Sequence, residues 1–457
     1  MRTYSFNKTI PVGQEVDVLV VGGGPSGFAA AIAASRNGAK TMLIEKHGCI
    51  GGMATVGLVG PFMTSFDATG DTQIIRGVFE ELVRRLEERG GAIHPSKVRR
   101  GTSYCAFIIP GHDHVTPFDP EWLKLVATEM VLESGVELLL HTQCLDVIKE
   151  GDRVTGVVAA NKSGLQAIEA AVIVDCSGDA DVAEWSGAPT VLGRQSDHGM
   201  QPATMFFRIC NVDSEKVKAY IEENRTLVGK PFHGPFSWLV EEARERGEWD
   251  VPRGEINMYE TPNPGEWRVN TTRILNIDGT NARDVTRAEI EGRRQARKVF
   301  EFIKSRIPGC ERARFMDTAA VVGIRETRHI VGEYVVTKED VLGCRMFDDS
   351  ILLASNSVDI HSKDAESGEY TVISGRWYGI PYRSLVPLSV ENLLVAGRPI
   401  SATSEASSAF RVMPCCIGTG QAAGTAAALA VKSGVVPRRV DVSRLRDLLR
   451  EQGVYLG

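Results

Sequence analysis

Short apolar runs alternate with a helical segment in the first 46 residues. VDVLVV at 16–21 is a branched apolar run of the kind that is buried in a parallel sheet, and GGGPSG and the helical stretch FAAAIAASRNG follow it. TMLIEK at 41–46 has the pattern of a second strand. This order predicts a β-α-β unit of about 30 residues, and parallel pairing then requires a right-handed crossover.

The next part of the chain predicts helices and a small meander. TQIIRGVFEELVRRLEERGG at 72–91 places apolar residues three and four apart and ends at glycines, which is typical of an amphipathic helix. Asp119 is the expected N-cap of a second helix. Strand-like runs with turns between them predict an antiparallel meander attached to the parallel sheet; they lie at 136–150, 153–162 and 167–178.

Between about residues 190 and 385 the polar segments that connect the predicted helices and strands are longer than in the rest of the chain. This part holds two strand-like runs, at 203–210 and 267–277, and a charged helical run at 287–307. NLLVAGR at 392–398 then returns to the pattern of a buried strand, and an alanine-rich helical segment follows it. We therefore expect an inserted second domain, with the first domain completed only near the C-terminus.

The glycines of GGGPSG fall as GxGxxG directly after a strand and directly before a helix. In such a turn the first glycine allows the tight bend, the second lets the backbone approach a pyrophosphate, and the third lets helix and strand pack closely. The helix N-terminus offers free N–H groups to the phosphates, and an acidic residue at the end of the second strand accepts hydrogen bonds from ribose hydroxyls. The predicted dinucleotide contacts are Gly22, Gly24, Pro25, Ser26, Gly27, Glu45 and Lys46.

The GxGxxG turn has two alternative interpretations, a purely structural turn and a site for NADP. A glycine-rich turn can be purely structural, but here strand, glycines, helix, second strand and acidic residue all occur in order. An acidic residue at position 45, in place of an arginine, disfavours the 2′-phosphate of NADP.

Later motifs favour FAD over NAD. Gly51-Gly52-Met53 forms a second glycine turn just past Glu45, and the chain here resembles FAD enzymes with the glutathione-reductase type of fold. VIVDCSGDADVAEWSGAP at 172–189 and NLLVAGR resemble two further cofactor motifs of that class. The stretches GIRETRHIVGEYVVT, VDIH, YGIPYRSLVP and NLLVAGRPISATSEASSAFRVMPCCIGTGQAAG resemble one family in particular, the FAD-dependent oxidoreductases.

The resemblance covers residues 15–435 and implies an FAD enzyme, while substrates differ among proteins that share this platform. One departure is Arg398, because many relatives carry an acidic residue after the glycine of the final strand. The further cofactor-binding residues that we expect are Gly51, Gly52, Met53, Cys144, Gly178, Asp179, Gly397, Arg398, Val412 and Met413.

The expected fold class is therefore α/β. It combines a Rossmann-type FAD-binding domain, made of a parallel sheet and a small antiparallel meander, with an inserted α+β substrate domain. We expect the FAD-binding domain to be discontinuous and to comprise residues 1–60, 115–190 and 385–457. Residues 61–114 are expected to form a connecting helical and loop segment, and residues 191–384 the inserted substrate domain.

Cys415 and Cys416 are adjacent where a loop turns into the C-terminal helix. A cysteine at a helix N-terminus can have a lowered pKa, which makes a redox pair conceivable. A disulfide between neighbours in sequence is strained, however, and no motif supplies a resolving partner. We therefore interpret both thiols as small packing residues beside the cofactor and assign the redox chemistry to the flavin.

Four residues are the candidates for substrate chemistry. Arg325 and Arg328, in GIRETRHI, can fix a carboxylate, a phosphate or a polyol through forked hydrogen bonds, although a structural ion pair with a neighbouring glutamate is a close alternative. His361 alternates with Asp359 on a strand and can exchange a proton near neutral pH. Arg411 could stabilise reduced flavin or an anionic substrate, and its rival role is a salt bridge to Glu405.

Composition and net charge disfavour nucleic acid, a membrane span and a metal ion as partners of this chain. The formal net charge of −6 leaves no basic surface for nucleic acid, and no apolar run reaches the roughly 18 residues that span a bilayer. The polar N-terminus and nine scattered cysteines favour a soluble, cytoplasmic protein. His112 and His114 have metal-like spacing but no third cluster, so we expect no metal.

We therefore predict an FAD-dependent oxidoreductase that transfers a hydride between a small polar organic molecule and flavin N5. The alternatives are a flavin reductase or monooxygenase with transiently bound NAD(P)H, and a non-redox binding subunit stabilised by FAD. The sequence leaves the oligomeric state open between a monomer and a homo-oligomer.

Overall fold

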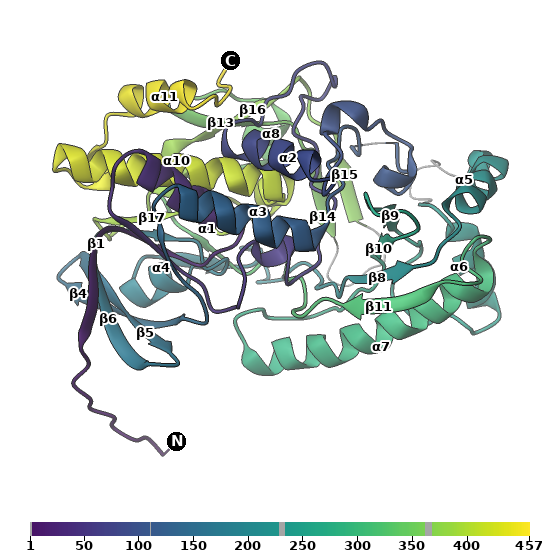
Figure 1. The fold of residues 1–457 in the computed structure, drawn as a ribbon, viewed down its shortest axis with the longest axis horizontal. Coiled ribbons are helices and arrows are strands. Elements are labelled where there is room, and N and C mark those ends of the chain that lie inside the picture. Colours follow the sequence, from purple (N-terminus) through teal and green to yellow (C-terminus); the bar gives the residue numbers. More distant parts are fainter. Residues whose placement is uncertain (1, 110, 228–233, 362–367) are drawn as a thin grey trace.

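A computed structural model describes residues 2–109, 111–227, 234–361 and 368–457. Its largest sheet has the strand order β3-β2-β1-β6-β5-β4, with β17 also paired to β6 (Figure 1). The parallel strands are β1 (Val12–Val21), β2 (Thr41–Ile44), β3 (Glu137–Leu139), β6 (Gly164–Asp175) and β17 (Leu393–Val395). The antiparallel strands are β4 (Gln143–Glu150) and β5 (Arg153–Asn161).

The long strand β6 joins the two parts of this sheet. Its first half pairs with β5 in the antiparallel meander, and its second half pairs in parallel with β1 and β17. The parallel sheet and the meander expected from the sequence are therefore confirmed. The run expected at 136–150 is divided instead between β3 and β4, because His141 has φ of +51° and turns the chain between them.

Helices α1 (Pro25–Arg36) and α10 (Met413–Ser433) lie side by side over the parallel sheet (Figure 1). Small residues allow this approach: a Cβ on Gly420 would lie 2.1 Å from the carbonyl oxygen of Ser26, and a Cβ on Gly424 would lie 2.0 Å from that of Ala30. The two glycines are four residues apart and so share one face of α10. The backbones of the two helices are thus in direct contact.

Further helices cover the first lobe. They are α2 (Val78–Glu88) and α3 (Pro120–Glu133), and the Oδ1 of Asp119 caps α3 by accepting from the N–H of Glu121 at 2.7 Å. Helix α2 begins later than the amphipathic pattern, because Gly77 has φ of +64°. Among the described residues no helix is both long and apolar enough to cross a membrane.

The second lobe is an antiparallel sheet with the strand order β11-β8-β10-β9. Its elements are β8 (Phe207–Cys210), β9 (Met258–Glu260), β10 (Trp267–Val269), β11 (Arg314–Thr318), α5 (Ser214–Glu223), α6 (Ser237–Glu245) and α7 (Ala282–Arg306). Figure 1 shows α7 running along this sheet at the lower right. The run expected at 267–277 leaves the sheet after Val269, and the Thr272 hydroxyl bonds to both backbone groups of Met205 instead.

The buried apolar residues of the two lobes form separate clusters, and those of the first lobe are themselves divided into two main clusters at the large sheet. The second core draws on residues from the inserted sheet and α7 between Ala203 and Val322. Residues 336–384, which we expected in the inserted domain, contribute Val336, Ile351 and Tyr378 to the first core instead. The physical reason is that strand β13 packs directly on α10.

The remaining elements complete the first lobe or connect the lobes. They are α4 (Asp181–Ser186), β7 (Thr190–Leu192), β12 (Arg328–Ile330), α8 (Lys338–Leu342), β13 (Ser350–Ala354), β14 (Val358–His361), β15 (Gly368–Thr371), β16 (Tyr378–Pro381), α9 (Ser404–Phe410) and α11 (Val442–Glu451).

The contact between α1 and α10 gives a prediction for Gly424→Ala. Alanine normally stabilises a helix by about 1 kcal/mol relative to glycine. Here the added methyl group would overlap the Ala30 carbonyl oxygen, and we expect a net destabilisation of about 1–3 kcal/mol. Chemical denaturation measures the change. Ser433→Ala, at the exposed end of the same helix, should stay within about 0.5 kcal/mol; a more stable Gly424→Ala protein would contradict the packing described.

Candidate active site

One cavity of about 970 Å³ lies where the carboxyl ends of the parallel strands meet the inserted lobe. Its walls include Gly22 after β1, Glu45 after β2 and Ser177 after β6. The inserted lobe contributes Tyr259 of β9. This volume is at the upper end of the range for ligand sites, which is about 300–1,000 Å³.

The glycine turn at the start of α1 fits a dinucleotide. A Cβ on Gly27 would lie 1.7 Å from the carbonyl oxygen of Gly22, so the turn itself requires this glycine. Gly24 is different, because a Cβ there would meet no protein atom within 4 Å, yet Gly24 lines the cavity. The space beside it is suited to a ligand that approaches the backbone. No side chain caps α1 at Gly24, which leaves the positive end of the helix toward that ligand.

Glu45 is held rigidly at the end of β2. Its Oε2 accepts from the N–H of Gly23 at 2.6 Å, and its Oε1 accepts from the N–H of His47 at 2.8 Å. The carboxylate is almost fully buried and lines the cavity. Each oxygen retains a further lone pair, so this group fits the hydroxyl donors of a ribose.

The other expected cofactor residues lie around the same space. The expected residues that line the cavity are Gly22, Gly24, Pro25, Ser26, Glu45, Lys46, Gly52, Met53, Cys144, Gly178, Asp179, Arg398, Val412 and Met413. The other three, Gly27, Gly51 and Gly397, are absent from that wall. Gly397 packs on α1, since a Cβ there would lie 2.6 Å from the Ser26 Oγ.

Arg398, the departure from the family pattern, is bound to protein groups. Its Nε donates to the carbonyl oxygen of Gly178 at 2.8 Å, and its Nη1 donates to that of Ile324 at 2.8 Å. Its Nη2 forms an ion pair with Asp179. The arginine therefore ties the turn after β6 to the segment that carries Arg325.

A second helix N-terminus meets the cavity at α10. Val412, Met413 and Cys416 line the wall, and no side chain caps this helix at Val412. Cys415 and Cys416 are both free thiols. Burial raises the pKa of Cys416 to about 12, and its Sγ donates to the carbonyl oxygen of Arg411 at 3.3 Å. Both features agree with the interpretation of Cys416 as a packing residue.

The structure separates Arg328 from the other three substrate candidates. Arg325, His361 and Arg411 all line the cavity, whereas Arg328 is absent from its wall. The Nη1 of Arg328 donates to the carbonyl oxygen of Asp179 at 3.1 Å and to the Asp181 Oδ1 at 3.0 Å. Arg328 therefore holds the turn after β6 in place from a position outside the cavity wall.

Arg325 and Arg411 bring positive charge to the cavity without a carboxylate partner among the described ion pairs. The Nη1 of Arg325 donates to the carbonyl oxygen of Pro202 and to the Thr204 Oγ1, each at 2.5 Å. Burial and the charge of Arg411 hold the pKa of Arg325 well below its usual range. Arg411 donates to the Gln201 Oε1 at 2.9 Å, so the salt bridge to Glu405 weighed above is not formed. This charge fits an anionic ligand.

Asp359 and His361 face the same side of β14, as their alternation predicts. The His361 Nε2 lies 3.5 Å from the Asp359 Oδ2. Burial lowers the pKa of His361 to about 4, an effect that Asp359 opposes and Arg325 reinforces. Burial alone would raise the pKa of Asp359, but His361, Arg411 and Arg325 hold it well below its usual range. At neutral pH the pair is thus a neutral imidazole beside a carboxylate.

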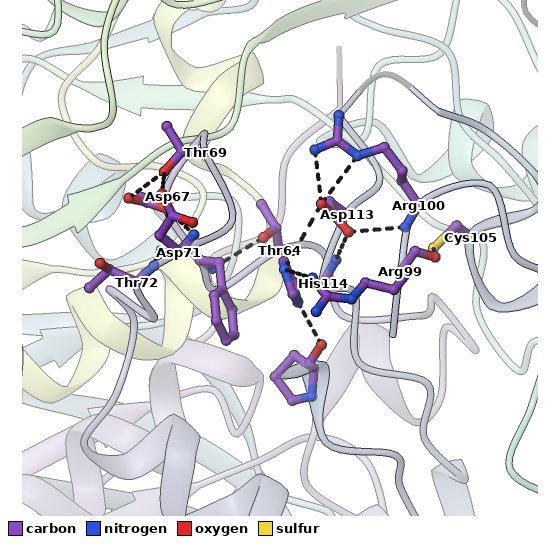
Figure 2. A network of polar contacts seen from close by, with 12 residues as sticks. Thr64, Asp67, Thr69, Asp71, Thr72, Arg99, Arg100, Cys105, Asp113 and His114 are labelled. Atoms are coloured by element: carbon purple, nitrogen blue, oxygen red, sulfur yellow. Dashed lines mark hydrogen bonds and ion pairs between the residues drawn. The ribbon is translucent and has the colours of Figure 1, made fainter. Parts of the chain in front are cut away.

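The histidines of GHDHV have different surroundings. The His114 Nδ1 lies 2.9 Å from the carbonyl oxygen of Pro95, and the His114 ring stacks on Phe66. Figure 2 shows His114 beside Asp113, Arg99 and Arg100 in a network of polar contacts. Asp113 accepts from Arg100, and His112 lies on the cavity wall. Among the residues that the structure describes, no three histidine, cysteine or acidic side chains are grouped to hold a metal ion. The bonds of Asp113 to Arg100 and of His114 to Pro95 hold the chain directly after His112 in place.

Sequence reasoning missed one wall of the cavity. Its polar residues come mainly from the hairpin of β9 and β10 and its approach, namely Arg253, Glu255, Asn257, Tyr259 and Asn270. They belong to no motif, and the strands there are only three residues long. The alternation of apolar and polar residues along a strand does not distinguish a polar side chain that points into a cavity from one that points into solvent.

The FAD dependent oxidoreductase family model matches residues 17–449. The chain belongs to this family. It is an FAD-dependent oxidoreductase, and the cofactor expected from the sequence is confirmed. Since the match extends over nearly the whole chain, it includes both lobes and both helix N-termini at the cavity.

Similarity to individual proteins is partial. Digeranylgeranylglycerophospholipid reductase 3 of Methanosphaera stadtmanae is 28% identical over 188 residues, which are 38% of this chain and 42% of that protein. Thiamine thiazole synthase of Aeropyrum pernix is 32% identical over 143 residues, 31% of this chain and 43% of that protein. The chain thus spans less than half the length of these curated relatives.

Among solved structures, a geranylgeranyl bacteriochlorophyll reductase-like protein from Thermoplasma acidophilum has a TM-score of 0.47 and 16% identity, and the match covers 96% of this chain and 84% of that one. The p-nitrophenol 4-monooxygenase of Pseudomonas putida has a TM-score of 0.49 and 12% identity, with 96% and 86% covered.

The position of Glu45 gives a prediction for FAD affinity. Glu45→Ala removes a charged acceptor from the cavity, and we expect FAD to bind about 10–100-fold more weakly. Titration of the apoprotein with FAD, followed by flavin fluorescence, measures this change. Glu150→Ala, on an exposed part of β4, is the matched control and should bind FAD as the wild type does. Equal affinity in the Glu45 variant would mean that this carboxylate does not contact the cofactor.

Proposed function

We propose that this FAD-dependent oxidoreductase oxidises a small polar organic acid by hydride transfer to flavin N5. The observation that carries the proposal is the presence of Arg325, Arg411 and His361 in the same cavity as the cofactor-binding turns. Bound FAD supplies a two-electron centre that accepts a hydride. The rest of the reaction is assigned to residues of this chain.

Arg325 and Arg411 bind the acidic group of the substrate. A guanidinium presents a planar fork of N–H donors that matches a carboxylate or a phosphate. The bonds from Arg325 to Pro202 and Thr204 fix the orientation of one such fork. Burial lowers the pKa of Arg411, and the charges of Asp359 and Glu326 oppose this effect. Neither arginine is ion-paired with a carboxylate among the described ion pairs, so each can bind an anionic substrate.

His361 accepts the proton that the substrate loses. Its Nε2 lies toward Asp359, so we assign proton exchange to Nδ1. During oxidation a carbon–hydrogen bond breaks and its electron pair leaves as hydride, while a hydroxyl or amino proton moves to His361 and a carbonyl or imine forms. Asp359 orients the imidazole and stabilises its protonated form.

Anaerobic mixing of the holoenzyme with candidate reductants tests this function. Bleaching of the flavin by hydroxy, amino or sugar acids would support it. Bleaching by NADH or NADPH alone would instead favour a reductase or monooxygenase. A flavin that dithionite reduces but no organic acid or nicotinamide bleaches would overturn the proposal in favour of a non-redox role.

His361→Asn should slow flavin reduction by about 10²–10⁴-fold, because general-base catalysis contributes a factor of that size. Stopped-flow absorbance under anaerobic conditions gives the rate, and the FAD content should stay unchanged. His198→Asn is the matched control, since His198 is exposed and absent from the cavity wall. If the two variants reduced equally fast, His361 would not be the base.

The pKa of His361 predicts the pH profile. The base is active when neutral, and a pKa lowered to about 4 keeps it neutral well below its ordinary value. The second-order rate constant of flavin reduction, which reports the enzyme before substrate binds, should therefore stay level between about pH 8 and 5 and fall only below that range. Stopped-flow rates at substrate concentrations well below saturation measure the profile. A fall centred near pH 6.5 would contradict the buried environment assigned to His361.

A further inference from the structure

The hairpin of β9 and β10 forms a polar wall of the cavity. Tyr259 pairs with Arg268 across the hairpin, and the backbone N–H of Asn270 donates to the carbonyl oxygen of Asn257 at 2.7 Å. The two asparagines are therefore neighbours at the open end of the hairpin, and both line the cavity. His112 joins this wall from another loop, with its ring stacked near Tyr259 at a centroid distance of 6.2 Å.

This wall carries buried hydrogen-bonding atoms without a partner among the described residues. They are the Asn257 Oδ1, the Asn270 Oδ1 and the His112 Nδ1. Asn257 is only 3% exposed. Buried polar atoms are nearly always paired, so a group of unpaired ones around a cavity indicates a ligand that completes them.

The chemistry of these atoms selects hydrogen-bond donors. The Asn257 Nδ2 donates to the Glu255 Oε1 at 2.7 Å, which fixes the amide with its Oδ1 as an acceptor. A hydrogen bond with the Asn270 side chain opposes the rise that burial causes in the pKa of Tyr259. The amide group of Asn270 is thereby engaged with Tyr259, and its Oδ1 is left to accept.

The charge of the wall favours neutral donors over an ammonium group. Glu255 is paired with Arg253 at 2.8 Å, so the pair carries no net charge. The positive charge of the cavity comes instead from Arg325 and Arg411, which lie on its wall and donate to neutral protein groups. An ammonium group would be repelled there, whereas hydroxyl groups would not.

The wall and the catalytic strand face one ligand space. His112, Asp359 of β14 and Glu255 of the polar wall all line the same cavity. Burial lowers the pKa of His112, and the charges of Asp359 and Glu255 both oppose this effect, so His112 interacts electrostatically with both walls. A ligand held by its acidic group at Arg325 and Arg411 can therefore extend toward Asn257 and Asn270.

We propose that Asn257 and Asn270, with His112, form a subsite for the hydroxyl groups of a polyhydroxylated carboxylic acid, of the sugar-acid class. This inference rests on the proposed function and specifies its substrate: the arginines bind the carboxylate and the asparagines bind the hydroxylated chain.

A set of six-carbon acids tests the subsite. D-Gluconate, D-glucuronate and D-galacturonate carry hydroxyl groups, hexanoate lacks them, and 6-aminohexanoate replaces them with an ammonium group. Each is titrated into the holoenzyme anaerobically, and the shift or bleaching of the visible flavin spectrum is recorded. We expect at least one hydroxylated acid to act at a concentration at least about tenfold lower than hexanoate.

Asn257→Leu and Asn270→Leu should reduce that preference at least about fivefold, because leucine removes the hydroxyl acceptors and adds an apolar surface that suits hexanoate. Asn7→Leu, at an exposed position, is the matched control. A preference that persists in both variants would overturn the subsite.

The outcomes also separate this inference from the proposed function. If hexanoate or 6-aminohexanoate acts as well as every hydroxylated acid, or if only small hydroxy or amino acids bleach the flavin, the subsite is overturned and the oxidoreductase function stands. If neither these acids nor any other organic acid changes the flavin spectrum, both are overturned.

Discussion

The direct backbone contact between α1 and α10 is the constraint on which the site depends. Gly420 and Gly424 remove the side chains that would separate the helices, and Gly397 packs against Ser26 at the same junction. Two helix N-termini without side-chain caps are thereby brought to one cavity. Because each N-terminus carries a partial positive charge, their convergence favours an anionic cofactor such as FAD.

The two sides of the cavity are built in different ways. The cofactor side relies on backbone: glycine turns, helix termini and strand ends, with Glu45 held by main-chain N–H groups. The side to which we assign the substrate is lined by charged and polar side chains from β14, the β9–β10 hairpin and the segment around Arg325. A backbone platform tolerates changes in the inserted lobe, so the cofactor identifies the family whereas the substrate depends on a few side chains.

The sequence predicts the backbone elements of the cofactor side better than the side chains that line the rest of the cavity. The β-α-β unit, the glycine turn and the buried final strand are local patterns with strong periodicity, and all are confirmed. The extent of the inserted lobe depended on long-range packing of β13 on α10, which no local pattern contains. Arg325 and Arg328 look alike in GIRETRHI, and only the turn after β6, distant in sequence, directs Arg328 to Asp181. Asn257 and Asn270 were missed because they meet only when the hairpin forms.

The most direct test of the account is a titration of the apoprotein with FAD and, separately, with FMN. If the helix N-termini and Glu45 form one cradle for a dinucleotide, one FAD should bind per chain and FMN should bind much more weakly, because FMN lacks the adenosine half that would reach β2. Equal affinity for FMN, or no binding of FAD, would contradict the central claim that this cavity is built around the whole dinucleotide.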